Sequence, residues 1–93
     1  MAKKRKCPLV MIEWLDSIRP RPAWEPVSGI ESEVARCVSV GWLLIDEKTH
    51  KGLAPNMAII GDDRETMQAA GLMTISTASI VKITKLKEPG LTF

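Results

Sequence analysis

The chain has 93 residues, a length that fits one domain with a single modest core. Its net charge of +2 is unevenly distributed, because residues 3–6 carry four consecutive positive charges. Without that run, nine basic residues face eleven acidic ones, so the remainder does not resemble a basic nucleic-acid-binding surface. No apolar run approaches the ~20 residues that span a bilayer, which argues against a membrane partner. We expect a cytoplasmic domain over residues 8–87, with a basic, disordered tail at 1–7 and a loose tail at 88–93.

The first predicted strand covers residues 9–15, LVMIEWL, and ends at a polar turn. The connection that follows, residues 18–33, contains three prolines, which exclude a regular helix or a central strand. Loops of this length in a compact domain are usually functional or disordered. Trp24 lies in its middle and argues against simple disorder. We therefore expect Trp24 either to fold back onto the sheet or to wait for a ligand.

The longest predicted strand covers residues 34–45, and its side chains are largely apolar on both faces. A flat strand with one wet face would not have this pattern, so we predict a strong bend, with Gly41 as the bend or bulge. A polar hairpin connection over residues 46–52 follows, and Gly52 is suited there to a left-handed conformation. These features predict a sheet that bends enough to close on itself.

The remaining chain predicts three further strands, at residues 53–60, 72–76 and 80–86. Pro55 indicates an irregularity near the start of the first of them. The last also fits a helix by the spacing of its apolar residues, but its β-branched residues favour a strand. A tight turn at residues 77–79 joins the last two strands.

A polar loop, residues 61–71, separates the third and fourth predicted strands. Its segment 64–70 can form one or two helical turns, with Asp62 or Asp63 as the cap. Two adjacent carboxylates can also hold a metal ion, but a helix cap in a solvated loop is the commoner role. We therefore predict no metal site there.

This order of elements resembles that of SH3-like and Sm-like small barrels. The resemblance implies an all-β, five-stranded barrel with a long Pro-rich loop after the first strand. In Sm-like proteins the fourth and fifth strands lie at exposed edges and pair between subunits, so it also implies a homo-oligomer built through edge strands. Ser76 and Thr77 stand where the bacterial Sm-like branch has a Lys-His dipeptide, which puts ordinary Sm-type RNA binding in doubt.

The chain also resembles small proteins encoded by bacteriophages and prophages over residues 9–86. The likeness rests on an early strand that ends in Trp-x-Asp, a Trp in the loop, a Ser-Val-Gly-Trp strand, a Leu-Ala hairpin return and Met-Thr-Ile before a final Ile-rich strand. In this sequence these are Trp14-Leu15-Asp16, Trp24, Ser39-Val40-Gly41-Trp42, Leu53-Ala54 and Met73-Thr74-Ile75. Some small phage barrels sequester nucleotide immune signals, so the resemblance implies an anti-defence role in the host cytoplasm.

The candidate ligand-binding residues fall in two segments. Trp24 can stack on a nucleobase, and Arg19 and Arg21 can meet its phosphate from a stiff Arg-Pro-Arg-Pro segment. Ser76 and Thr77 can donate to phosphate oxygens, or only stabilise their own turn. The leading prediction is therefore a protein that binds a small nucleotide-type ligand. An adaptor that inhibits a host protein and an Sm-like RNA-binding protein are the alternatives.

Enzyme signatures are missing from the sequence. His50, the only histidine, lies in a polar hairpin, and with Cys7 and Cys37 it cannot supply the ligands of a zinc site. A Gly-rich phosphate loop and a Gly-x-Ser-x-Gly elbow are also missing. We therefore predict a non-enzymatic protein without cofactors, whose two cysteines are reduced thiols.

Overall fold

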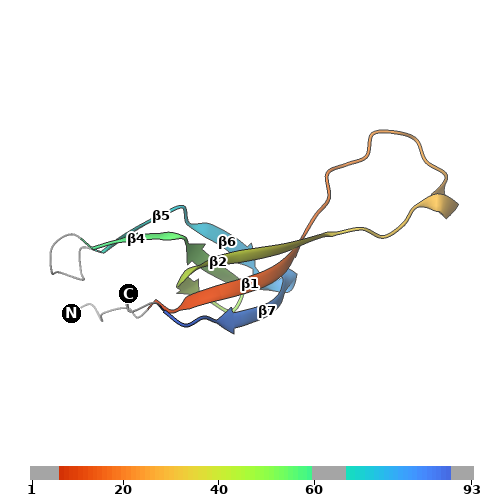
Figure 1. Ribbon diagram of the computed structural model, residues 1–93. Helices are drawn as coiled ribbons and strands as arrows, with labels where there is room; N and C mark the ends of the chain where they lie inside the picture. The colour runs from red at the N-terminus through yellow and green to blue at the C-terminus, as the bar shows by residue number, and fades with distance from the viewer. Residues whose placement is uncertain (1–6, 60–66, 89–93) are drawn as a thin grey trace.

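The computed structural model describes residues 7–59 and 67–88. The described chain is mostly β-structure, in agreement with the predicted all-β class. Five antiparallel strands form the main sheet in the order β6-β3-β2-β1-β7 (Figure 1). Their bounds are β1 Leu9–Asp16, β2 Ala35–Asp46, β3 His50–Ala54, β6 Met73–Ser76 and β7 Ile80–Lys85. Two shorter strands, β4 Asn56–Ala58 and β5 Gln68–Ala70, pair separately.

Strand β1 lies inside the sheet, between β2 and β7. Its alternation predicts the observed burial, because Val10 and Ile12 point to one face and are 3% and 0% exposed. The register confirms a shared face, since Ile12 pairs with Ser39 of β2 and with Ile83 of β7. The predicted strand over residues 9–15 is therefore confirmed.

Strand β2 confirms the long predicted strand, and a side chain at Gly41 would clash, but the irregularity of the strand does not lie there. The irregularity in its pairing with β3 lies between Leu43 and Ile45, not at Gly41. A Cβ on Gly41 would lie 2.9 Å from the carbonyl oxygen of Ala54, a distance that real Cβ atoms do not adopt. Gly41 is thus required because the backbone of β3 approaches β2 closely at this point.

The prediction that Gly52 adopts a left-handed conformation is wrong. Gly52 is buried in β3 and pairs with Ile45, so it belongs to the ladder instead of the turn. Among the described glycines, Gly71 alone has a positive φ, of 82°, at the step from β5 to β6. The hairpin turn is shorter than predicted, because β3 already begins at His50.

Pro55 divides the predicted third strand into β3 and β4, which confirms the irregularity there. The predicted helical turns at 64–70 are wrong for Gln68–Ala70, which form strand β5 and pair with β4. A helix of one or two turns is not stable by itself, whereas pairing with β4 gives the backbone of these residues hydrogen-bond partners. The remainder of that segment, its caps Asp62 and Asp63, and the tails 1–6 and 89–93 lie outside the described residues.

The last two strands are joined as predicted. A single 3-10 turn, η3 Thr77–Ser79, connects β6 to β7. Strand β7 confirms the choice of strand over helix for this segment. Strands β6 and β7 each have one neighbour in the described sheet, so they form its two edges.

The core is small. Its buried members are Cys7, Val10, Ile12, Leu53, Ala54 and Ile75. Trp14, Leu43, Met73 and Ile80 are partly buried against it. Cys7, which the sequence assigned to the N-terminal tail, is 0% exposed, and neither Cys7 nor Cys37 forms a disulfide.

Candidate functional site

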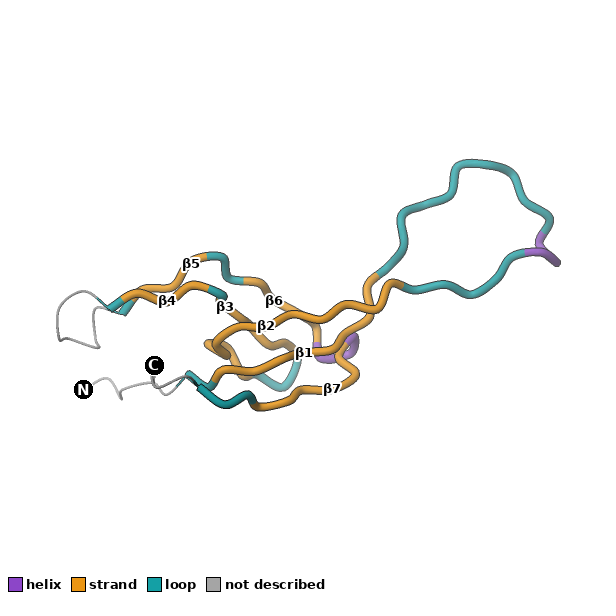
Figure 2. The backbone as a smooth tube through the Cα atoms, in the orientation of Figure 1, coloured by secondary structure: helices purple, strands orange, loops and turns teal. Residues whose placement is uncertain are grey.

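The most unusual part of the molecule is the connection between β1 and β2, residues 17–34, which we call the arm. It projects away from the sheet, as Figures 1 and 2 show, and the 3-10 turn η1, Val27–Gly29, lies toward its far end. The molecule measures 61 × 24 × 23 Å with a radius of gyration of 17.8 Å. A compact chain of this length would have a radius of roughly 12 Å. The arm therefore stands out as a separate, projecting element.

The arm carries exposed apolar side chains. Trp24 is 102% exposed, and Val27 is 86% exposed. Ile30 and Val34 are each 53% exposed on the returning half of the arm. The expectation that Trp24 folds back onto the sheet is therefore wrong, because the prolines beside it stiffen the arm and direct it outward.

Arg21 forms one ion pair along the arm and a second one across it. Arg21 Nε lies 3.3 Å from Glu25 Oε2, and Arg21 Nη1 lies 3.8 Å from Glu33 Oε2 on the returning half. These side chains are 37–63% exposed, so each pair stabilises the arm only slightly. The two ion pairs matter for ligand binding, because the Arg21 guanidinium that was predicted to meet a phosphate already faces two carboxylates.

The backbone of the arm contributes few hydrogen bonds of its own. The amide of Gly29 donates to the carbonyl of Pro26 at 2.9 Å, and that of Ile30 donates to Val27 at 3.3 Å. At the base, the amide of Ser17 donates to the carboxylate of Asp16 at 2.8 Å. The prolines lack the N–H groups that a strand ladder needs. The sheet therefore ends where the arm begins.

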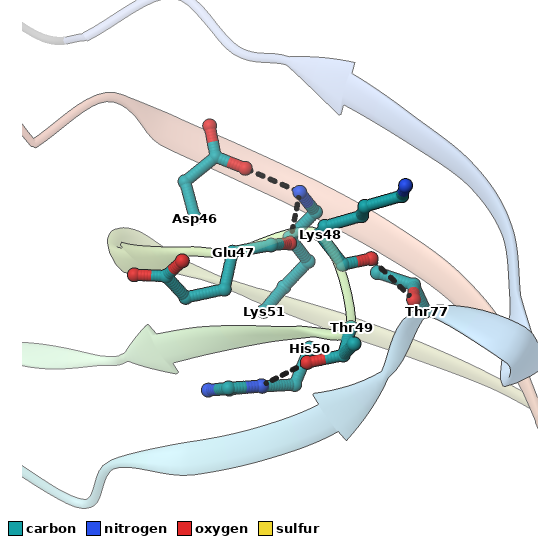
Figure 3. A network of polar contacts seen from close by, with 7 residues as sticks. All are labelled: Asp46, Glu47, Lys48, Thr49, His50, Lys51 and Thr77. Atoms are coloured by element: carbon teal, nitrogen blue, oxygen red, sulfur yellow. Dashed lines mark hydrogen bonds and ion pairs between the residues drawn. The ribbon is translucent and has the colours of Figure 1, made fainter.

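The second predicted segment, Ser76 and Thr77, lies where β6 ends and η3 begins. Figure 3 shows Thr77 at this corner of the sheet from close by. The Thr77 hydroxyl donates to the carbonyl of Lys48 at 2.8 Å, and the Thr77 amide donates to the carbonyl of Thr49 at 3.0 Å. Both bonds join η3 to the turn between β2 and β3. Thr77 thus stabilises the corner, which was the alternative that the sequence left open.

Other side chains of this corner are also paired with one another. Lys51 donates to the carboxylate of Asp46 and, at 2.8 Å, to the carbonyl of Glu47. Thr49 Oγ1 lies 2.9 Å from Nδ1 of His50 (Figure 3). This network fixes the turn between β2 and β3.

The five predicted ligand-binding residues are therefore not gathered at one place. Arg19, Arg21 and Trp24 belong to the arm, whereas Ser76 and Thr77 belong to the corner beside the sheet. A pocket of about 210 Å³ lies at the base of the arm, lined by Glu13, Trp14, Leu15, Arg36, Cys37, Val38 and Val81. It includes none of the five and is smaller than the ~300–1,000 Å³ of most small-molecule sites.

Sequence reasoning missed Val27, Ile30 and Val34 as exposed apolar residues of the candidate site. The available signal was their position between prolines, a glycine and glutamates, in a segment with neither helical nor strand periodicity. The described residues contain no group of three or more His, Cys, Asp or Glu that could hold a metal ion. Within the same residues, no helix is long and apolar enough to cross a membrane.

Comparisons with known proteins found no matching family model, no matching curated protein and no matching solved structure.

Proposed function

We propose that this protein is a non-enzymatic interaction module that docks on another protein through its arm. The observation that carries the proposal is the complete exposure of Trp24 on a projecting segment. Tryptophan and arginine are the residues most enriched among those that dominate binding energy at protein interfaces. A fully hydrated indole gains more from burial against a partner than any other side chain of the arm.

The chemistry of the arm favours a protein over a polyanion. Residues 17–34 carry two basic and three acidic side chains, and Arg21 is paired with Glu25 and Glu33. A surface that reads phosphates would instead need unpaired positive charge. Apolar residues surrounded by charges of both signs match the central and rim residues of a protein interface.

The stiffness of the arm also supports docking. Pro20, Pro22 and Pro26 restrict the backbone, so less conformational entropy is lost when a partner binds. Exposed surface is available in quantity, because the chain has an accessible area of 7436 Å². A compact monomer of 10.3 kDa would expose roughly 5,400 Å².

The nucleotide-binding interpretation has less support. It places Trp24 on a base and Arg19 or Arg21 on the ligand's charge, with Ser76 and Thr77 as possible further donors. Arg21 faces Glu25 and Glu33 instead, and Thr77 is bonded to Lys48 and Thr49 beside the sheet. The interpretation stays a prediction, and nucleotide titration in the experiment below tests it.

We infer that the scaffold carrying the arm is a small barrel of the SH3-like or Sm-like type. The strand order β6-β3-β2-β1-β7 and the single 3-10 turn before the last strand support this inference. Such scaffolds host many unrelated functions, so the function is argued from the arm.

The test compares three proteins: the parent, Trp24→Ala, and a variant in which Asn-Gly replaces residues 17–34. Asp16 and Ala35 are directly paired, so a two-residue turn can close the hairpin without changing the register. A photo-crosslinking residue at position 27 in cells identifies the partner, and calorimetry with the purified partner measures affinity. We expect Trp24→Ala to weaken binding at least about tenfold and the armless variant not to bind.

Leu72→Ala is the matched control, because Leu72 is 52% exposed but lies outside the arm. It should bind the partner as the parent does. A partner that binds the armless variant with unchanged affinity would overturn the proposal. A nucleotide that binds the parent but not Trp24→Ala would replace the proposal with the nucleotide-binding interpretation.

A further inference from the structure

A second exposed apolar surface lies on the sheet itself. It consists of Leu15, Val38, Val40 and Val81, which we call the outer face. Val38 and Val40 pair with Glu13 and Met11, so they point away from the core residues Val10 and Ile12 of the same strand pair. Val38 is 62% exposed, Val40 51% and Val81 61%. The solvated face of an antiparallel sheet is normally polar, so three exposed valines here need an explanation.

The outer face is hollowed and spans three strands. The pocket at the base of the arm brings Val81 of β7 together with Leu15 of β1 and Val38 of β2. Val81 reaches this position because the register between β1 and β7 shifts between Glu13 and Trp14. A concave apolar patch of this kind receives a side chain from an opposing surface better than it accommodates water.

Charges of both signs surround the patch. Glu13 lies between Val38 and Lys82 in the paired strands, and Arg36 lines the pocket. None of these three side chains takes part in an ion pair among the residues that the structure describes. A patch that contains both an acid and bases can be complementary to itself when two copies meet across a two-fold axis.

The β7 edge of the sheet is a less suitable place for a second copy. Strand β7 carries Lys82 and Lys85, both exposed, and lysines on an edge strand oppose pairing with another strand. The homo-oligomer predicted through edge strands would place these lysines close to a neighbouring strand. Packing through the sheet face avoids that conflict, since stacked sheets lie about 10 Å apart.

We infer that the outer face packs against the same face of a second copy, giving a two-fold symmetric dimer. In this dimer Glu13 of each copy faces Arg36 or Lys82 of the other, and a valine of each copy enters the other's pocket. The arms lie outside the contact, so the dimer presents two of them. If the arms bind a partner as proposed above, the pair binds it bivalently, and each arm raises the effective concentration of the other.

The test measures the mass of the full chain by sedimentation equilibrium from about 1 to 200 μM. We expect the mass to rise from that of a 10.3 kDa monomer toward twice that value. Val38→Glu should weaken dimerisation at least about tenfold, because it places a charge without a partner in a dry contact. Val27→Glu is the matched control, since Val27 is also exposed but lies on the arm, and it should dimerise normally.

Circular dichroism establishes that each variant is folded, and Val81→Lys replaces Val38→Glu if the latter unfolds. A parent that stays a monomer across the whole range overturns this inference, as does a dimer that survives both outer-face variants. Failure here is distinguishable from failure of the proposed function. Loss of partner affinity in Trp24→Ala, with an unchanged dimer, concerns the arm alone.

Discussion

The sheet and the arm are continuous in the chain and both rich in apolar residues, but the sheet has a buried core whereas the arm leaves its apolar side chains exposed. Ile12 in β1 is 0% exposed, whereas Trp24, in the segment that leaves β1, is 102% exposed. The difference lies in the backbone. Strand β1 is paired on both sides, so its N–H and C=O groups find partners, while the prolines of the arm lack the N–H that a ladder needs. Apolar side chains are buried only where their backbone can also be satisfied.

This comparison has an energetic consequence. The sheet stabilises itself through burial, so substitutions there change the free energy of unfolding. The arm contributes little to folding because its side chains contact little within the molecule. Its apolar surface is available for a partner, so substitutions there should change binding and leave stability almost unchanged.

The largest expected effect is in the sheet. Ile12→Ala removes a fully buried side chain from the centre of the core and should lower the free energy of unfolding by about 2–5 kcal/mol. Val40→Ala, at a position 51% exposed on the same sheet, should cost less than about 1 kcal/mol. Urea denaturation followed by circular dichroism measures both. Equal losses would mean that the described core does not determine stability.

A smaller loss of stability is expected when a glycine of the sheet, Gly41, is replaced, and almost none when Gly29 of the arm is replaced. Gly41→Ala places a methyl group 2.9 Å from the backbone oxygen of Ala54 and should cost about 1–3 kcal/mol. Gly29→Ala on the arm has nothing within 4 Å of the new atom and should change stability by less than about 0.5 kcal/mol. Thermal unfolding of both variants tests the pair. A neutral Gly41→Ala would show that β3 does not cross β2 as closely as the structure has it.

The smallest expected effect is the replacement of the arm's indole. Trp24→Ala should alter the free energy of unfolding by less than about 0.5 kcal/mol, because no packed contact is lost. Trp14→Ala is the matched comparison, since its indole packs on the core and donates to Ser39 Oγ at 3.0 Å. That change should cost at least about 2 kcal/mol. A destabilised Trp24→Ala would instead make the arm part of the folded core.

Much of the strand pattern could be predicted from the sequence, because strand alternation and proline are local signals. The first and last strands, the break at Pro55 and the single turn at residues 77–79 agree with their predicted positions. The prediction failed where a local signal had a non-local cause. Gly41 reads as a bend in the sequence, but it is required by Ala54, thirteen residues away.

The candidate site was predictable in its parts but not in its arrangement. The sequence by itself determined that residues 18–33 cannot join the sheet and that Trp24 is unusual there, because proline chemistry acts within a few residues. Only the tertiary structure decided that Trp24 projects outward, that Arg21 faces Glu33, and that Thr77 is bonded to the turn beside it. Those contacts join residues distant in sequence, and no local preference records which of them the folded chain brings together.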